Sequence, residues 1–95
     1  MHIITRKRLN EFSEKHPDTK SSLEHWYKSM KNTNFESFAE IKRMFSTVDQ
    51  VGGLTVFNIA GNKARLVTAI HYNRHKVYIR AVLTHHEYDK SKWAQ

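Results

Sequence analysis

Three runs of alternating hydrophobic and polar residues fill the second half of the chain, over residues 54–60, 64–72 and 76–84. Alternation with a period of two is typical of β-strands that bury one face. Gly61 and Asn62 lie between the first two runs, and both residue types tolerate the positive φ angles of a tight hairpin turn. Residues 73–75 separate the second run from the third. The pattern predicts three antiparallel strands joined by two hairpins.

The same pattern predicts how the strands pair. A two-residue loop in each hairpin places Asn58 opposite Arg65 and Ala69 opposite Arg80. In this register the sheet has one apolar face and one polar, cationic face, whereas a slip of one residue would mix them. The predicted apolar face carries Phe57, Ile59, Leu66, Ile70, Val77, Ile79, Ala81 and Leu83. The predicted polar face carries Asn58, Arg65, His71, Tyr78, Arg80 and Thr84.

The first half of the chain predicts one strand and three helices. Residues 1–4 are short and apolar, as in a strand that joins a larger sheet. Helices are predicted over residues 6–16, 19–31 and 34–45, with the first ending before Pro17. The second has the clearest apolar stripe, in which Trp26 and Tyr27 belong to the predicted core rather than to a base-stacking surface. A polar loop is predicted over residues 46–53.

Each predicted helix has a candidate cap at its start. Thr5 and Asp18 are the predicted N-caps of the first two helices. Thr33, followed three residues later by Glu36, has the form of a capping box for the third. Amphipathic helices and a sheet with one apolar face bury these surfaces against each other. The expected fold is therefore a two-layer α+β domain. Its N-terminal strand and helices pack on one face of a mainly antiparallel sheet, and the cationic face is left open.

Composition narrows the class of partner. The chain has 95 residues, which suits a single domain, and its formal net charge of +7 favours a polyanion such as nucleic acid, an anionic membrane or an acidic protein. It has no cysteine, which excludes a disulfide framework and thiolate metal sites. The apolar runs are too short to span a bilayer and the N-terminus lacks the apolar stretch of a signal peptide, so a cytoplasmic protein is expected.

The polar face and its exit hold residue types that suit phosphate chemistry. Arg65 and Arg80 can bind a phosphodiester through charge-assisted hydrogen bonds and stabilise its pentacoordinate transition state. His85 and His86 can transfer protons near neutral pH, and Tyr88 can stack on a base or deliver a proton. Without metal ligands, this set suits attack of an RNA 2′-hydroxyl on the adjacent phosphate. The products would be a 2′,3′-cyclic phosphate and a 5′-hydroxyl.

Simpler interpretations stay open at this point. The cationic face can be a solvated surface that holds two arginines, and histidines are common at strand ends. The histidines at positions 71, 75, 85 and 86 can be drawn as a zinc site, but their spacing fits no zinc pattern. We therefore expect neither a metal nor another cofactor.

Several motifs, taken in order, resemble the HigB toxin family. They are Val56-Phe57-Asn58-Ile59-Ala60-Gly61-Asn62, Arg65-Leu66-Val67, Tyr78-Ile79-Arg80 and Thr84-His85-His86-Glu87-Tyr88-Asp89. The resemblance implies the RelE-like fold for residues 1–95 and the role of toxin in a type II toxin–antitoxin system. Toxins of this kind are endoribonucleases that cut translated mRNA on the ribosome without metal. A HigA-like antitoxin with a helix-turn-helix domain neutralises them.

The resemblance also suggests roles for individual residues. Arg65 and Arg80 are expected to hold the scissile phosphate, His85 to act as general acid or base, and Tyr88 to stack or assist proton transfer. Glu87 and Asp89 are expected to orient His85 and nearby basic groups. The candidates for binding the RNA are Asn58, Asn62, Lys63, His86 and Lys90.

Two further hypotheses compete with the nuclease. One is a non-catalytic RNA- or ribosome-binding module that uses the same face, which predicts salt-sensitive binding without strand cleavage. The other is a toxin-like fold kept only as the partner of a DNA-binding protein. Analysis of RNA ends separates the nuclease from both.

Overall fold

Five strands form one open sheet in the order β1-β5-β4-β3-β2 in a computed structural model of the chain, which describes residues 1–90 (for Lys90, the backbone alone). The strands are β1 (His2–Ile4), β2 (Asp49–Val51), β3 (Leu54–Ile59), β4 (Ala64–His71) and β5 (Lys76–Thr84). β1 runs parallel to β5, and every other neighbouring pair is antiparallel. The predicted mainly antiparallel sheet is confirmed.

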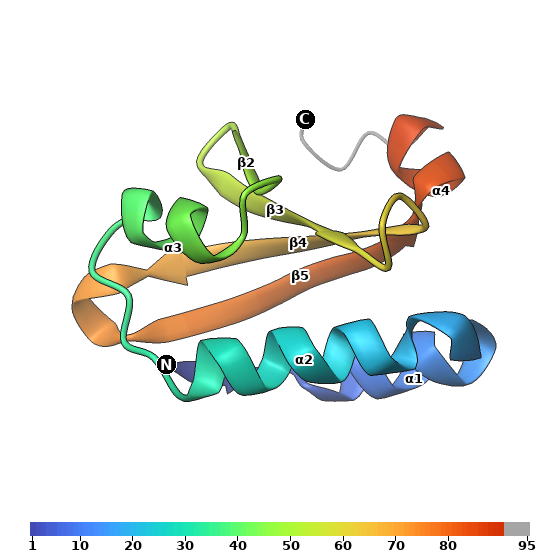
Figure 1. The fold of residues 1–95 in the computed structure, drawn as a ribbon, viewed down its shortest axis with the longest axis horizontal. Helices are drawn as coiled ribbons and strands as arrows, with labels where there is room; N and C mark the ends of the chain where they lie inside the picture. Colours follow the sequence, from blue (N-terminus) through green and yellow to red (C-terminus); the bar gives the residue numbers. More distant parts are fainter. Residues whose placement is uncertain (91–95) are drawn as a thin grey trace.

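Two long helices lie side by side along one face of this sheet (Figure 1). They are α1 (Lys7–Lys15) and α2 (Lys20–Lys31), linked by the short 3₁₀ helix η1 (Pro17–Thr19). A third helix, α3 (Phe38–Met44), lies beside β2 and β3, and α4 (His85–Lys90) follows β5 at the opposite end of the sheet (Figure 1). The expected α+β fold with helices on one face is confirmed.

The core lies between the sheet and the helices. Phe57 at its centre meets the ring of Trp26 from α2 at 5.4 Å and the ring of Phe45, just after α3, at 5.2 Å, both edge to face. Trp26 is 1% exposed, as the helical stripe predicted. Such pairs stabilise by about 1 kcal/mol beyond the area they bury. Trp26 therefore stabilises the fold and is unavailable for stacking on RNA.

The first hairpin has the predicted register, with Asn58 opposite Arg65. The positive φ angles fall on Ala60 (54°) and Gly61 (69°) rather than on Gly61 and Asn62. This shift leaves the side chain of Asn62 close to Arg65, a contact that matters for the site described below.

The predicted register of the second hairpin is wrong. The turn is a 3₁₀ helix, η2 (Tyr72–Arg74), followed by His75 in the left-handed region (φ 53°), so that His71 pairs with Lys76. The N–H of His2 donates to the carbonyl of His75 at 2.8 Å, which ties this turn to β1. Contact with β1 is a long-range constraint that a local turn rule does not contain.

A β-bulge in β5 changes the predicted faces. Thr68 pairs with Ile79 and Val67 with Ala81, so Arg80 has no partner across the strand. The extra residue reverses the alternation beyond it. Ala81 and Leu83, predicted on the apolar face, therefore lie on the polar face, and Val82 packs against the core instead.

The three predicted helix caps are wrong as well. α1 begins after Arg6 without a side-chain cap, and Thr5 has a φ of 75°. Asp18 lies within η1 and pairs with Lys63 at 3.0 Å rather than capping α2. Residues 34–37 are neither helix nor strand, and α3 is capped by Ser37, whose Oγ accepts the N–H of Glu40 at 3.4 Å.

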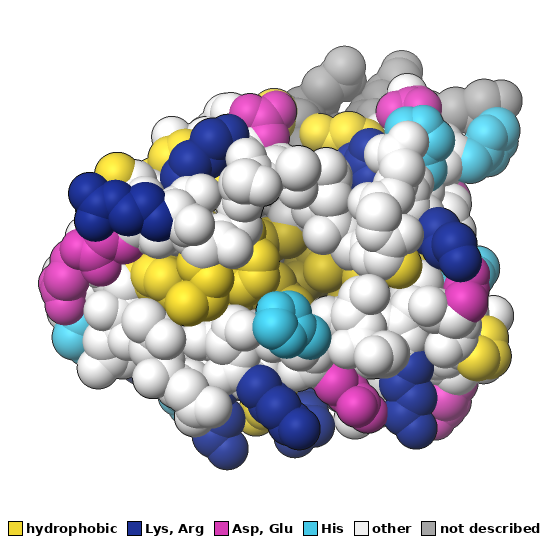
Figure 2. Space-filling view, viewed as in Figure 1, with side chains coloured by type: hydrophobic (Ala, Val, Ile, Leu, Met, Phe, Trp, Pro, Cys, Tyr) yellow, Lys and Arg dark blue, Asp and Glu magenta, His cyan; other side chains and the backbone are white. Residues whose placement is uncertain are grey.

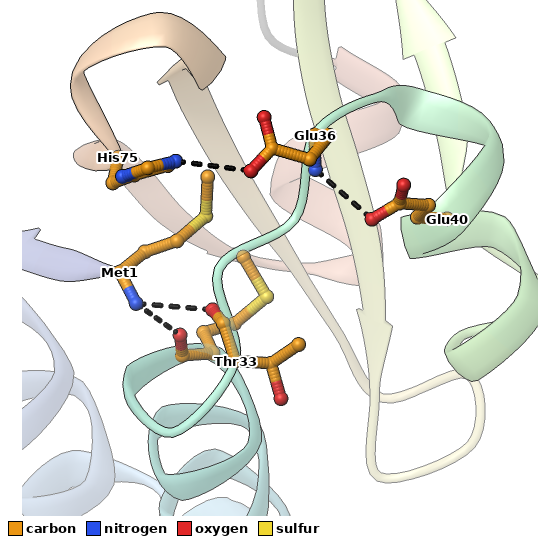
Figure 3. A network of polar contacts seen from close by, with 6 residues as sticks. Met1, Thr33, Glu36, Glu40 and His75 are labelled. Carbon is orange, nitrogen blue, oxygen red and sulfur yellow. Dashed lines mark hydrogen bonds and ion pairs between the residues drawn. The ribbon is translucent and has the colours of Figure 1, made fainter.

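The start of the chain explains why the third helix begins late. The Met1 ammonium group donates to the carbonyls of Met30 (2.9 Å), Lys31 (3.1 Å) and Thr33 (3.0 Å), at the end of α2 (Figure 3). A cation at a helix C-terminus is favourable because the helix dipole leaves negative charge there. Residues 32–36 are thereby held beside β1, where Glu36 also contacts His75 at 3.2 Å (Figure 3).

Candidate active site

α4 begins at a reciprocal capping box. The Thr84 N–H donates to Glu87 Oε1 at 2.9 Å, and the Glu87 N–H donates to Thr84 Oγ1 at 3.1 Å. The backbone N–H of His85 donates to the carbonyl of Lys63 at 3.0 Å, which ties the helix to the β3–β4 loop. These bonds fold the end of β5 into a helical turn that presents His85, Tyr88 and Asp89 beside β4.

These bonds bring several side chains together in one cluster, and Arg65 makes the most contacts within it. One of its Nη2 contacts is to Asn62 Oδ1 and another is to His85 Nδ1 at 3.2 Å, while Nη1 donates to the carbonyl of Ala64 at 3.2 Å. His85 Nε2 lies 3.2 Å from Asp89 Oδ2. The structure thus places four of the predicted site residues, from two segments far apart in the sequence, in direct contact.

This geometry fixes how His85 bonds. A guanidinium group has only donors, so the ring nitrogen Nδ1 must accept from Arg65. The proton of a neutral ring is then on Nε2, where the Asp89 carboxylate accepts it. Asp89 contacts His85 at the position that an orienting group would occupy, and its orienting role stays a prediction. Nδ1, the nitrogen that faces Arg65, carries the lone pair.

Tyr88 lies over the same arginine. The Arg65 guanidinium carbon is 5.6 Å from the centroid of the Tyr88 ring. Burial and the nearby Asp49 carboxylate raise the pKa of the Tyr88 phenol above its usual value, an effect that Arg65 opposes. The phenol is therefore protonated at neutral pH and can donate a hydrogen bond or a proton. Asp49 is in β2, within the stretch that the sequence analysis predicted as a loop, so it was not expected beside this site.

Arg80 stands apart from this cluster. It is exposed, and it makes no hydrogen bond or ion pair with the residues that the structure describes. It lies three residues along β5 from Leu83, which pairs with Arg65, a distance of ~10 Å along the strand. The predicted grip of Arg65 and Arg80 on one phosphate is thus not preformed, and Arg80 suits a neighbouring phosphate better.

The remaining predicted site residues differ in their exposure and in the partners that they contact. Asn58 is exposed and pairs with Arg65 across the strands, and His86 is exposed on α4. Lys63 is paired with Asp18 of η1. Glu87 is engaged with Thr84 and so does not orient His85. The side chain of Lys90 lies outside the described residues.

A family model for HigB toxins, described as RelE-like toxic components of toxin-antitoxin systems, matches residues 19–91. This match includes β2 to β5 and the whole cluster around Arg65. The chain belongs to the HigB toxin family.

Relatives of this HigB-family chain agree with that assignment over almost its full length. It is 36% identical over 92 residues to the mRNA interferase toxin HigB of Escherichia coli (strain K12), covering 94% of this chain and 88% of that protein. An mRNA interferase HigB of Shigella flexneri gives the same values. One from Escherichia coli O6:H1 is 27% identical over 93 residues, covering 95% of this chain and 90% of that protein. The predicted family and toxin class are confirmed.

Residues 1–90 of this HigB-family chain contain neither a metal-binding cluster nor a membrane-spanning helix. No group of three or more His, Asp and Glu side chains within residues 1–90 could hold a metal ion. Over the same residues, none of the helices is both long enough and apolar enough to cross a bilayer.

The capping box gives a first testable prediction for the HigB-family site. Glu87→Ala removes one half of the box and is expected to weaken α4 by about 1 kcal/mol, lowering RNA cleavage about fivefold. Glu87→Gln retains a side-chain acceptor and is expected to stay near wild type. Cleavage rates of the two purified variants test this, because equal losses would mean that the charge of Glu87 matters rather than the cap.

The stability of the same capping box is expected to depend on pH, which amide exchange can follow. Hydrogen bonds from Thr84, with Lys15 and His16 nearby, lower the pKa of Glu87 below its usual value. A lowered pKa in the folded state means that the stabilisation is present above the unfolded-state pKa and is lost as pH falls through the folded-state pKa. Fraying of α4 in acid is therefore expected in the wild type and absent in Glu87→Gln, as judged from amide exchange in α4.

Proposed function

We propose that this HigB-family toxin is a metal-independent endoribonuclease that cuts mRNA during translation on the ribosome. The observation that carries the proposal is the contact of Arg65 with His85 Nδ1 at 3.2 Å, beneath the ring of Tyr88. The guanidinium group of Arg65, the imidazole ring of His85 and the phenol of Tyr88 lie around one point on the polar face of the sheet, which supports a shared role in phosphate chemistry. The names of the relatives, mRNA interferases, support the same reaction.

In the proposed reaction the phosphodiester binds to Arg65. The guanidinium group turns from His85 to a non-bridging oxygen of the scissile phosphate, which frees the lone pair of Nδ1. This nitrogen then takes the proton of the 2′-hydroxyl as its oxygen attacks phosphorus. Asp89 stabilises the imidazolium that forms, because its carboxylate already accepts the Nε2–H.

The leaving group needs a proton of its own. As the bond from phosphorus to the 5′-oxygen breaks, the Tyr88 phenol donates its proton to that oxygen. Solvent then returns the proton from His85 to Tyr88. The products are a 2′,3′-cyclic phosphate and a 5′-hydroxyl, and Arg65 stabilises the additional negative charge of the transition state.

The RNA is proposed to extend along the polar face. Asn58 and Asn62 lie next to Arg65, and Arg80 projects from the bulge further along β5. Lys63 joins this surface only if it leaves Asp18, with which it now pairs. The remaining proposed partners are the ribosome and a helix-turn-helix antitoxin of the HigA type, and the proposed location is the cytoplasm, where translated mRNA is found.

A purified chain added to ribosomes that are translating a defined mRNA tests the proposal. We expect new in-frame ends carrying 5′-hydroxyl groups, and much less cleavage of the same RNA without ribosomes. RNA that is bound in a salt-sensitive manner, without new 5′-hydroxyl ends, would contradict the nuclease and favour the binding module. Chelation of divalent ions after assembly should leave the cleavage step intact.

A further inference from the structure

A groove of about 390 Å³ lies between α2 and the free end of β3. Trp26, Phe45 and Ile59 line its apolar part, and Ser22 and His25 of α2 are on its rim. Figure 2 shows it as a hollow with hydrophobic side chains at its base, which opens on the side of the molecule where α2 faces the sheet. The groove is separate from the Arg65 cluster, although Asn58 of β3 borders both.

The edge of β3 is unpaired at this groove. Val51 and Leu54 form the closing pair of a hairpin whose loop is Gly52-Gly53, both with positive φ, so this pair exchanges main-chain hydrogen bonds. Because hydrogen-bonded pairs alternate along an antiparallel strand, the main-chain N–H and C=O groups of Val56 and Asn58 point to the same edge of β3, the edge that faces β2. β2 begins at Asp49, which pairs with Val56, so it does not extend far enough to pair with Asn58. The N–H and C=O of Asn58 are therefore left without a strand beside them.

An extended main chain fits this edge better than a helix. Unpaired strand edges bind extended segments by adding a strand, and adjoining pockets take alternate side chains. The apolar base of the groove suits one hydrophobic side chain of such a segment.

The charge of the toxin indicates which kind of segment binds in the groove. The formal net charge of the whole chain is +7, and a protein of this charge attracts an acidic segment at long range. Membership of a toxin–antitoxin family provides one protein partner, the antitoxin. We infer that an extended, acidic segment of the antitoxin binds along the edge of β3 at Asn58 and inserts an apolar side chain into the groove beside Trp26.

This inference rests on the antitoxin partner of the proposed function and not on its chemistry. Bound here, the segment would cover Asn58 and lie next to Arg65 without replacing RNA on His85 or Tyr88. Inhibition would then come from blocking the path of the RNA at one end of the polar face.

Amide exchange of the toxin, measured by NMR with and without its HigA-type antitoxin, tests the contact directly. The Asn58 amide is expected to exchange quickly in the free toxin and at least tenfold more slowly in the complex. The Val56 amide, already bonded to β2, is the internal reference and should change little. A complex in which the exchange of Asn58 is unchanged, or a toxin that does not bind the antitoxin, overturns the inference.

A groove-filling substitution provides a second test. Ser22→Trp places an indole ring in the groove and is expected to raise the Kd for the antitoxin at least 100-fold while RNA cleavage is retained. Ser13→Trp, on α1 and outside the groove, is the matched control and should bind normally. Normal antitoxin binding by Ser22→Trp overturns the inference. Loss of cleavage by the wild type would instead contradict the proposed function, so the two failures are distinguishable.

Discussion

Replacing Arg65 with alanine is expected to reduce the rate of mRNA cleavage on the ribosome by about 100-fold or more, the usual loss when one transition-state contact is removed. Arg65 is the residue that Asn62, His85 and Tyr88 all contact. Its removal takes away the cation that is proposed to bind the phosphate and also a hydrogen-bond partner of the histidine. Single-turnover cleavage of a defined mRNA on translating ribosomes measures the effect.

Three further arginine variants test whether the effect is specific to Arg65. Arg65→Lys retains the charge but lacks the planar fork of donors, so it is expected to recover only part of the rate. Arg43→Ala changes an exposed arginine on α3, far from the cluster, and should cleave like the wild type. Arg80→Ala is expected to lose less than Arg65→Ala, because Arg80 does not contact the cluster. Full cleavage by Arg65→Ala would show that the active face has been assigned wrongly.

Replacing His85 with glutamine is expected to lower the cleavage rate on the order of 100-fold or more, as for loss of a general base. The glutamine amide can still hydrogen-bond to Arg65 and Asp89, but it cannot take a proton from the 2′-hydroxyl. The substitution should therefore lower the rate of the chemical step without weakening RNA binding. Single-turnover rates at saturating toxin, together with binding measured by filter retention, separate the two.

The variants at the neighbours of His85 decide how the proton-transfer role is divided. Asp89→Asn retains a side-chain oxygen to accept the Nε2–H and is expected to cost less than His85→Gln. Tyr88→Phe removes only the phenolic proton, and its loss should be greatest with a natural 5′-oxygen leaving group. A His85→Gln variant that cleaves normally, beside an inactive Tyr88→Phe, would move the base from His85 to another residue.

The three long strands could be located from the sequence because their pattern is local. Alternation of side chains sets the faces of a strand, and turn residues between the runs mark its ends, so β3, β4 and β5 differ from the prediction by no more than one residue at either end. The α2 stripe was predictable for the same reason, since Trp26 and Met30 repeat at helical spacing and are both buried. The family motifs then identified Arg65, His85, Tyr88 and Asp89 together.

Two other elements, α4 and β2, also have local signals in the sequence, although they were not among the predicted elements. Thr84 and Glu87 have the spacing of a capping box, and this signal predicts α4. Gly52 and Gly53 have the composition of a tight hairpin turn, which predicts β2 beside β3. With α4 and β2 in place, the position of Asp49 near Tyr88 would follow, and with it the cause of the raised pKa of the phenol.

What the sequence determined by itself is the set of elements, the apolar surfaces that must be buried and the chemistry available to the polar face. Only the tertiary structure decided the bulge at Arg80 and the turn at His75, because both depend on contacts with strands distant in the sequence. It also decided that Glu87 caps a helix while Asp89 contacts His85. Two carboxylates close together in the sequence can each bond to several partners, and which bond forms depends on distances in the folded chain that no local pattern encodes.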